Sequence, residues 1–337
     1  MKKLLYALPF VALFWSACKN DFDVAAPWKE IPVVYAMLSP DDTAHYVRVE
    51  KAFLDEDKSA IEISKIGDSL YYPENAISVY IVRDKTSDRL LLKRVDGVKE
   101  GLVKDTQPRW LYKLPTNLND KILPGEKYRV EVERADGKSK VTGETTIPKD
   151  FVFTTPTPAN FPRNVSFQFE NGIDFQWRSD VNGLYFNLTM RVKYREEAPD
   201  GTVLMRRTIE WMPIVNVARS DIGAPNYLGK ANVSQERFFK MLADSVGPIQ
   251  PNRFRYFELG DLVLEGGGYE IGEFLKIAAT ASGITGAEVL PTYTNLSEGY
   301  GLVTSKNAVL LDGIRITPAT VDAMGVHPLT GLLGFRL

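Results

Sequence analysis

The fold of this chain is decided by residues 123–132, which read Leu123-Pro124-Gly125-Glu126-Lys127-Tyr128-Arg129-Val130-Glu131-Val132. The Pro-Gly pair is a turn signal, because proline fixes its φ angle and glycine accepts a positive φ. From Tyr128 onward apolar and polar residues alternate, which is typical of a β-strand with one buried face. Asp136-Gly137 then indicates a hairpin turn, and residues 140–146 are expected to form the returning strand. The stretch therefore predicts a turn, a corner and a half-buried strand of an antiparallel sheet.

The order Leu-x-Pro-Gly-x-x-Tyr before an alternating strand resembles the tyrosine corner of fibronectin type III and immunoglobulin-like sandwiches. In those domains the tyrosine hydroxyl binds a backbone group at the corner. The alternative is an ordinary turn that precedes a strand by chance. Further short strand candidates upstream have the β-branched and apolar content of strands; they lie at 33–38, 46–50, 78–82 and 90–92. We therefore predict an immunoglobulin-like β-sandwich over residues 28–148, with a polar insertion around 55–74.

The second half of the chain is also predicted to be β-rich. Residues 149–158 contain prolines and threonines without periodicity, so we expect an extended linker there. Residues 159–337 follow as a larger β domain, in which Trp177 is expected to fill the core. A few short helices are expected between its strands; they lie after Ser234, over 269–280 and after Thr317-Pro318. The predicted fold class is mainly β, a sandwich followed by a larger β domain with inserted helices.

The N-terminus has the order of a secretory signal peptide. Met1-Lys2-Lys3 is positively charged, residues 4–15 are an apolar run interrupted by a proline, and Ser16-Ala17 are small. A positive start, an apolar segment and small residues at the cleavage site define such signals. The apolar run is too short to cross a bilayer comfortably, which takes ~20 residues. Residues 1–17 are therefore predicted to be a signal peptide.

Cys18 directly follows this signal and is the only cysteine among the 337 residues. Small residues before a cysteine resemble the lipobox of bacterial lipoproteins. The resemblance implies that a diacylglycerol is joined to the Cys18 thiol, that an acyl chain such as palmitate is added to the new amine, and that residues 18–27 are a lipidated tether. With no second cysteine, the thiol has no partner for a disulfide in an oxidising compartment. The alternatives are an ordinary cleaved signal and an uncleaved N-terminal membrane helix.

A short charged stretch after the cysteine indicates on which side of a membrane the protein lies. It reads Lys19-Asn20-Asp21-Phe22-Asp23. It resembles the acidic export signals that follow the lipidated cysteine in surface-exposed lipoproteins of Bacteroidota. That resemblance implies an outer-membrane protein, lipid-anchored and exposed at the cell surface. A solvated tether between lipid and domain explains the same residues equally well.

Charge and composition narrow the partners. The chain has 43 acidic and 41 basic residues, a formal net charge of −2, and 44% apolar residues. Nucleic-acid binding requires a concentrated basic face, so this balance argues against nucleic acid as a partner. The apolar content is ordinary for a globular protein.

Motifs that carry chemistry are nearly missing from the sequence. It has only two histidines, His45 and His327, and both are expected to be surface or packing residues. No Gly-x-Ser-x-Gly nucleophile elbow occurs, and Asp55-Glu56-Asp57 lacks the spacing of a calcium loop. We therefore predict no catalytic residue, no metal site and no cofactor. A glycan-processing enzyme with a pair of carboxylates remains a less favoured alternative, because the fold sets the spacing of such pairs.

Two further sets of candidate residues remain. Asp42-Thr43-Ala44, Asp68-Ser69-Leu70 and Asp244-Ser245-Val246 match the pattern at which Bacteroidota O-glycosylate exported proteins, so glycans are predicted on Thr43, Ser69 and Ser245. Trp28, Trp110 and Trp211 are candidates for ligand stacking, because a flat exposed ring can bind a sugar or a peptide.

The C-terminal stretch 291–303, Pro-Thr-Tyr-Thr-Asn-Leu-Ser-Glu-Gly-Tyr-Gly-Leu-Val, carries a family resemblance. It is similar to a segment near the end of a large family of Bacteroidota outer-membrane lipoproteins that are β-rich and often encoded beside TonB-dependent receptors. The resemblance implies a non-catalytic lipoprotein that presents a binding surface as an accessory to such a receptor. A structural or adhesive surface lipoprotein is the alternative. From the residues alone, Asn295 is expected to hold a turn, while Gly299 and Gly301 allow close backbone packing.

Overall fold

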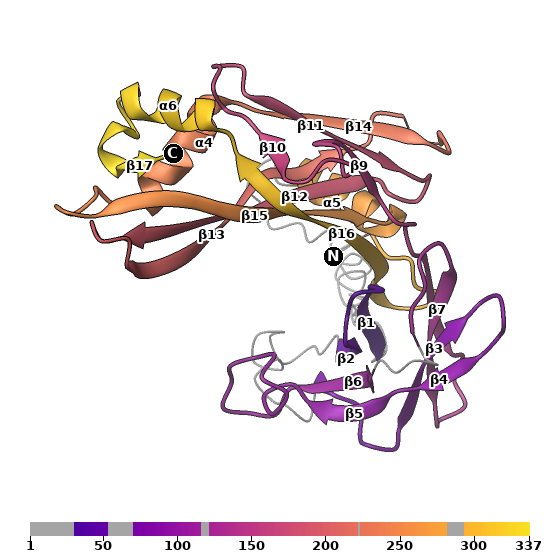
Figure 1. Cartoon of the computed structure of the whole chain (residues 1–337). Helices are drawn as coiled ribbons and strands as arrows, with labels where there is room; N and C mark the ends of the chain where they lie inside the picture. The colour runs from indigo at the N-terminus through magenta and orange to yellow at the C-terminus, as the bar shows by residue number, and fades with distance from the viewer. Residues whose placement is uncertain (1–29, 53–69, 116–120, 222, 282–292) are drawn as a thin grey trace, which may run out of the picture.

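The computed structural model describes residues 30–52, 70–115, 121–221, 223–281 and 293–337 (Figure 1). The structure is mainly β, with a few short helices, as predicted. The strands are β1 Ile31–Leu38, β2 Ala44–Ala52, β3 Ile77–Arg83, β4 Arg89–Leu91, β5 Lys93–Asp96, β6 Trp110–Pro115, β7 Lys127–Arg134, β8 Val141–Thr146, β9 Val152–Thr155, β10 Arg163–Val165, β11 Ile173–Ser179, β12 Tyr185–Glu197, β13 Val203–Ala218, β14 Tyr227–Val233, β15 Phe254–Gly267, β16 Tyr300–Ile316 and β17 Phe335–Arg336. The helices include α4 Gln235–Ser245, α5 Tyr269–Ala281 and α6 Pro318–Val326, with a 3-10 turn at Gly331–Leu333.

Strands β1 to β8 form a β-sandwich. One sheet has the order β1-β2-β6-β5 and the facing sheet has the order β4-β3-β7-β8. The chain changes sheet between β2 and β3, between β4 and β5 and between β6 and β7, which are Greek-key connections of the immunoglobulin-like kind. Alternate residues of the strands bury one face of each sheet, and Val47, Val79, Ile81 and Val130 have almost no exposed surface.

The tyrosine corner is present at the start of β7. The Leu123 backbone N–H donates a hydrogen bond of 3.0 Å to the hydroxyl of Tyr128, whose ring is buried. Gly125 adopts φ +76°, the left-handed conformation that the turn requires and that glycine tolerates. The Pro-Gly turn, the corner and the alternating strand predicted for residues 123–132 are therefore all confirmed.

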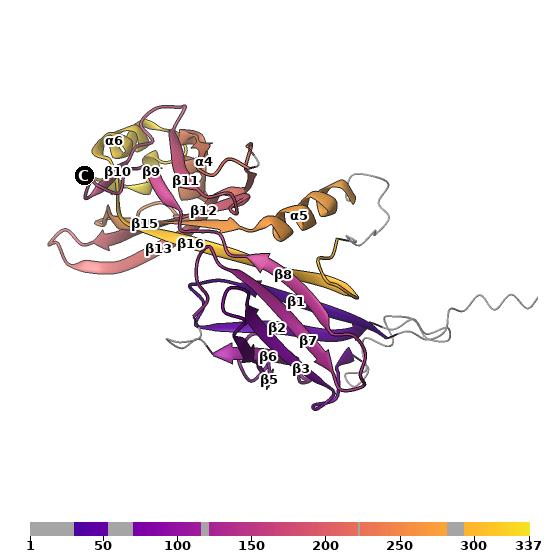
Figure 2. The same ribbon diagram turned by 90° about the vertical axis from the view of Figure 1, so that its right-hand side faces the viewer.

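Strand β16 joins the two halves of the molecule. Its first part pairs in parallel with β1, from Val33 beside Tyr300 to Leu38 beside Ser305. Its second part pairs with β15, beginning at Lys306 beside Gly267. One strand therefore extends the sandwich and then enters the second sheet, so that a continuous sheet runs β13-β12-β15-β16-β1-β2-β6-β5. Figure 2 shows the shared strand β16 between the two halves of the molecule.

The second half packs the long strands β12, β13, β15 and β16 against a small sheet of order β14-β11-β9 and against α4. Its core is aromatic: Trp177 is fully buried, and Phe167 stacks on Phe238 with ring centroids 4.1 Å apart. The prediction that Trp177 fills a core is confirmed. The helices also lie where the sequence placed them, and Ser234 caps α4 by accepting a hydrogen bond from the Arg237 N–H.

The segment 149–158 differs from the expected linker. Residues 152–155 form strand β9, which pairs with β11, and Phe151 and Phe153 are buried in the second core. The prolines at 156 and 158 stop this strand, but they do not prevent the two phenylalanines from packing. The extended-linker prediction was therefore wrong, because burial of two aromatic rings outweighs the local preference of the flanking residues.

Candidate functional site

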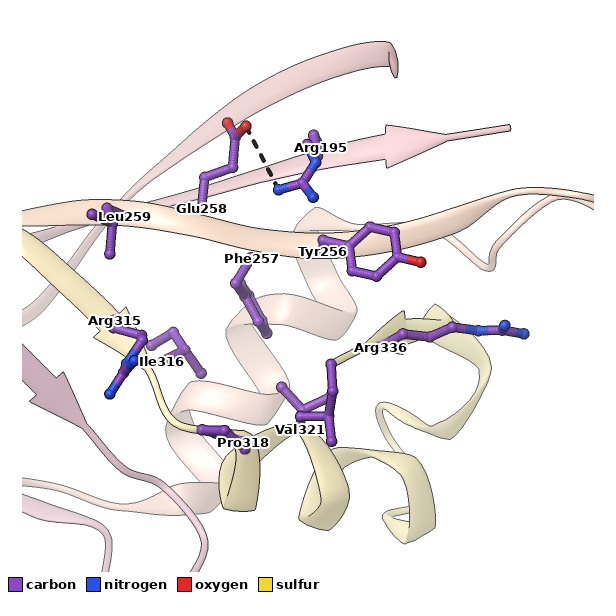
Figure 3. A pocket seen from close by; sticks show the side chains of 11 residues that line it. Arg195, Tyr256, Phe257, Glu258, Leu259, Arg315, Ile316, Pro318, Val321 and Arg336 are labelled. Carbon is purple, nitrogen blue, oxygen red and sulfur yellow. Dashed lines mark ion pairs between the residues drawn. The ribbon is translucent and has the colours of Figure 1, made fainter. Parts of the chain in front are cut away.

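A groove with a volume of about 580 Å³ lies between β15, the end of β16 and α6 (Figure 3). We call it the arginine groove. Its lining consists of cationic and apolar side chains from four separate parts of the second half: Arg195, Tyr256, Phe257, Glu258, Leu259, Arg315, Ile316, Pro318, Val321, Arg336 and Leu337. Strand register brings them together, since β12, β15 and β16 are neighbours in one sheet.

The floor of the groove is apolar and held by packing. The Phe257 ring stacks on Phe335, with centroids 4.2 Å apart and the planes 11° from parallel. Ile316 ends strand β16 and Val321 lies one turn into α6; both are buried. Pro318 begins α6 at a position where its missing N–H costs no hydrogen bond. The floor is therefore set by a strand end, a helix start and an aromatic pair.

Three arginines surround this floor, and they differ in their partners. Arg195 lies over the Tyr256 ring at 5.0 Å and donates a hydrogen bond to the Glu197 carboxylate. Arg315 is exposed and, among the described residues, donates only to the amide oxygen of Asn164, at 2.8 Å. Figure 3 shows Arg315 at one end of the groove and Arg336 at the other.

Arg336 lies over the Phe254 ring at 4.0 Å. Within the described part of the chain, neither Arg315 nor Arg336 forms an ion pair with a carboxylate. The one acidic side chain in the lining, Glu258, is engaged by Arg206 at 3.0 Å. The groove thus offers two guanidinium groups that are not neutralised by a side-chain carboxylate.

This arrangement suits binding of an anion better than proton transfer. Arginine stays protonated throughout the physiological pH range and presents donors in a fork that matches carboxylate or phosphate oxygens. An apolar floor beside these donors can remove the apolar body of the same ligand from water. The groove therefore has the chemistry to hold an anionic molecule with an apolar part.

A second pocket of about 510 Å³ lies where β8, α5 and the segment 293–297 meet. Glu270, in the first turn of α5, accepts a hydrogen bond of 2.8 Å from the Thr145 hydroxyl, which lies 2.9 Å from the Ser305 hydroxyl. Burial raises the pKa of the Glu270 carboxyl. These contacts join both halves of the molecule, and the two hydroxyls are internal to the joint. We assign this pocket a structural role.

The candidate stacking tryptophans fall in different places. Trp110 is half-buried and lines a pocket of about 350 Å³ on the sandwich, but the Arg94 guanidinium already lies over its ring at 4.4 Å. Trp211 is half-buried against the second core, 6.0 Å from the Phe238 ring. Neither tryptophan lines the arginine groove, and the structure does not bring the two together. Trp28 lies outside the described residues.

The other candidates can be placed only in part. Thr43 and Ser245 are exposed, the first in a turn before β2 and the second at the end of α4. Cys18 and Ser69 lie outside the described residues. His45 is buried, and burial lowers its pKa, while His327 packs edge-on against the Phe239 ring. Across the described ranges, no group of three His, Cys, Asp or Glu side chains is placed to hold a metal ion.

Sequence reasoning missed the arginine groove. Arg195, Arg315 and Arg336 are far apart along the chain, and none belongs to a recognisable motif. One local signal existed: Arg315 is the second-last residue of a long strand, two residues before the Thr317-Pro318 pair that begins a helix. Such strand-to-helix junctions often place side chains in a binding crevice.

Comparison with known proteins adds little to this picture. No family model and no curated protein matches the chain. Solved structures with some similarity include a DUF4785 family protein of Legionella pneumophila, at 11% identity, 67% coverage of this chain, 50% of that chain and a TM-score of 0.17. Another is Rst D1-D2, at 9% identity, 86% coverage of this chain, 99% of that chain and a TM-score of 0.16. This chain therefore spans about half of the first protein, and at these TM-scores neither similarity carries an argument.

One property of the helices bears on membrane association. In the part of the chain that the structure describes, no helix has both the length and the apolar character needed to cross a bilayer.

Proposed function

We propose that this protein is a non-catalytic, lipid-anchored lipoprotein of the outer membrane whose arginine groove binds an anionic ligand with an apolar part. We further propose that it serves as an accessory to a TonB-dependent receptor. The signal-like residues 1–17 and Cys18 support the anchor. The family resemblance of residues 291–303 supports the receptor as the partner.

The observation that carries the ligand proposal is the pair Arg315 and Arg336. Two guanidinium groups without a carboxylate partner among the described residues flank an apolar floor. Both arginines are exposed, so their guanidinium groups are accessible to a ligand from solvent. A ligand anion would supply a carboxylate or phosphate partner for these guanidinium groups. Hydrogen bonds between two charged groups are shorter and stronger than those between neutral groups.

The position of the groove agrees with an anchored body that displays its ligand site. Tyr300, at the start of β16, lies beside Val33 of β1, while Arg315 lies at the other end of β16. At ~3.3 Å per residue, the two ends of this strand are up to about 50 Å apart. The groove therefore lies at the end of the molecule remote from the start of β1, as Figure 2 shows for α6.

The anchor is tested by Cys18→Ala. Each buried methylene of an acyl chain contributes ~0.8 kcal/mol, so two or more chains make release from the membrane negligible. We expect the parent chain to stay with the membrane fraction in high salt and the variant to lose that attachment. Equal membrane retention of the variant, or a free thiol on the mature protein, would contradict the anchor.

The groove is tested with octyl phosphate, a probe with an anionic head and a short apolar chain, measured by calorimetry on the whole protein below its micelle concentration. Octanol serves as the neutral probe. We expect Arg315→Gln with Arg336→Gln to weaken octyl phosphate at least ~10-fold, since each charge-assisted contact is worth roughly 1.5–3 kcal/mol. Arg178→Gln is the matched control, because Arg178 is exposed on β11 away from the groove. Equal binding by all three proteins would remove the groove from the proposal.

The receptor is tested separately, by pull-down from native outer membranes followed by identification of the captured proteins. We expect a TonB-dependent receptor among them. If none is recovered while the groove still binds its probe, the adhesive or structural alternative gains and the ligand site stands.

We also propose that Thr43, Ser69 and Ser245 carry O-glycans. The exposed positions of Thr43 and Ser245 leave room for a sugar at each. An intact-mass measurement of the mature protein is expected to exceed the lipidated chain by the mass of the glycans, and Thr43→Ala with Ser245→Ala is expected to lower it. A mass equal to that of the bare lipidated chain would exclude the modification.

A further inference from the structure

Strand β13 is a long edge with a free side. It spans Val203–Ala218, 16 residues, and pairs with β12; within the described residues it has no strand on its other side. From Met205 beside Glu196 to Trp211 beside Met190, its pairing with β12 runs without a register shift. The regular part of this edge, residues 205–211, presents a row of backbone donors and acceptors to any strand that can approach.

The exposed face of β13 carries an ordered series of side chains. Met205 and Ile209 pack toward the second core, so the alternate residues 204, 206, 208, 210 and 212 face solvent. Leu204 is 46% exposed and Met212 is 45% exposed, at the two ends of this series. The series is symmetric in character about Thr208: a charged residue lies on each side of it and an apolar residue lies at each end.

Symmetry restricts how two copies of this edge can pair. Antiparallel pairing of identical strands requires a two-fold axis perpendicular to the sheet, which leaves the solvent face of both copies on the same side. Residues directly opposite each other must then lie on the same face of the sheet. The axis therefore passes midway between the two copies of one residue, which we call the central residue. The choice of register is reduced to the choice of that central residue.

We propose that two copies of this chain associate through β13 in antiparallel register, with the axis at Thr208. Arg206 of each copy then lies opposite Glu210 of the other copy, twice over. Leu204 lies opposite Met212, and the two Thr208 side chains lie opposite each other. Opposite charges, apolar pairs and Thr–Thr pairs are all favourable across antiparallel strands.

Neighbouring registers are less favourable. An axis at residue 206 or 207 sets an arginine against its own copy, and an axis at residue 210 does the same for a glutamate; like charges directly opposite are destabilising. An axis at residue 209 brings no like charges together, but it places Arg206 opposite Met212 and leaves Glu210 opposite a threonine. Among these registers, only Thr208 at the axis pairs both charges.

The two charged side chains are accessible from solvent for this contact. The side chains of Arg206 and Glu210 are each 64% exposed. Each already has one partner within its own copy, Glu258 at 3.0 Å for Arg206 and Arg191 at 2.9 Å for Glu210. The contact between copies would therefore join two existing ion pairs into a network across the axis, and networks of this kind are stronger than isolated exposed pairs.

Cross-linking on intact membranes tests the register. In Thr208→Cys the two new thiols would face each other across the axis, within the ~4.4–6.8 Å Cα separation that a disulfide accepts. We expect mild oxidation to convert most of this variant to a disulfide-linked dimer. In Met212→Cys the two thiols would be eight residues apart along the paired strands, ~26 Å, and no dimer is expected. The parent chain gives the background from Cys18. Equal cross-linking of both variants, or of neither, would overturn the proposal.

A charge exchange tests the pairing without a covalent bond. We expect the purified full chain to have the mass of two copies by analytical ultracentrifugation, with the detergent contribution matched out. Arg206→Glu sets two glutamates opposite each other in both pairs and should weaken association ~10-fold or more. Adding Glu210→Arg to that variant should restore most of the loss, while circular dichroism checks that each variant is folded. If the parent chain is a monomer at every concentration, the dimer is excluded, and the β13 edge would be available to a strand of another protein. If the double variant does not regain association, the Arg206–Glu210 register is excluded.

Discussion

The two halves of the molecule are organised over different distances along the chain. In the sandwich, the tyrosine corner joins Leu123 to Tyr128, only five residues away. In the second half, Arg255 donates hydrogen bonds to Glu196, 59 residues away, and to the backbone carbonyl of Leu333, 78 residues away. The corner of the sandwich is a contiguous motif, whereas the contacts of Arg255 join several distant elements of the second half.

This difference explains why one half is easier to read from sequence than the other. A corner, a turn and an alternating strand are local patterns, and their physical causes lie in neighbouring residues. A buried arginine gives no such pattern, since its partners are defined only once the chain has folded. The comparison can be tested by removing the element that closes each half and measuring the free energy of unfolding.

The largest effect is expected for Arg255→Ala. Arg255 is buried and binds the Glu196 carboxylate at 2.8 Å, the Gly247 carbonyl at 2.6 Å and the Leu333 carbonyl at 2.8 Å. Its removal leaves Glu196 buried with a weaker set of partners, and breaking a buried pair in this way costs ~3–5 kcal/mol. Denaturant unfolding monitored by tryptophan fluorescence measures the loss.

Arg253→Ala is the matched control for that variant. Arg253 binds the same carboxylate at 3.1 Å, but more than a third of its side chain is exposed. An exposed partner of this kind contributes at most ~1 kcal/mol. If both variants lose the same amount, the second half does not depend on the buried charge and the contrast between the halves fails.

The joint between the halves is tested next, with Asn295→Ala. The Asn295 side chain donates hydrogen bonds to the carbonyls of Glu144 and Val303 and accepts one from the Val303 N–H, at 2.7–2.9 Å. The change leaves these backbone groups without their partner, which costs ~1–3 kcal/mol. Ser297→Ala, two residues away at an exposed site, should cost clearly less. Limited proteolysis between the halves is expected to be faster in Asn295→Ala alone.

Close packing at the same joint shows what sequence could and could not tell. Gly299 and Gly301 were expected to allow tight packing, and a Cβ at Gly301 would lie 1.9 Å from the Val34 carbonyl oxygen, at φ +132°. The two glycines predicted a close approach of another backbone segment, but their spacing did not indicate that this segment is β1. Parallel pairing of β1 with β16 joins residues that are nearly the whole chain apart, so no local pattern encodes it.

The same limit applies to the candidate site. The strand and helix elements around the arginine groove were predictable, since alternation and capping residues are local. The groove itself depends on which strands become neighbours, and that choice brings Arg195, Arg315 and Arg336 around one floor. Strand β9 was missed for a related reason: the burial of Phe151 and Phe153 depends on a core contributed by distant strands.

A smaller effect is expected for Tyr128→Phe, which removes the hydroxyl of the tyrosine corner and keeps the buried ring. The Leu123 N–H would lose its acceptor, at a cost of ~1–2 kcal/mol. Tyr80→Phe, on the outer face of the same sheet, is the control and should change the unfolding midpoint little. A Tyr128→Phe protein as stable as its parent would show that the corner is a consequence of the sandwich and does not stabilise it.

The smallest effect is expected at Glu270, and it depends on pH. Burial raises the pKa of this carboxyl in the folded protein above its unfolded value of ~4.3, although the Thr145 hydroxyl and the Lys127 charge oppose the shift. At pH values below ~4.3 both states hold the proton, so the folded state has its full stability. As the pH rises from there through the raised pKa, the unfolded chain releases the proton first and the free energy of unfolding falls. Glu270→Gln cannot titrate, so its free energy of unfolding should decline less than that of the parent over this range.

Glu236→Gln controls for the loss of an acid in the first turn of a helix, because Glu236 holds that place in α4 and is exposed. The two variants should differ only above pH ~4.3, with Glu270→Gln the more stable. Identical pH profiles would mean that the Thr145 hydroxyl solvates an ionised Glu270 without penalty. The polar contacts at the joint between the halves would then compensate fully for the burial of this carboxylate.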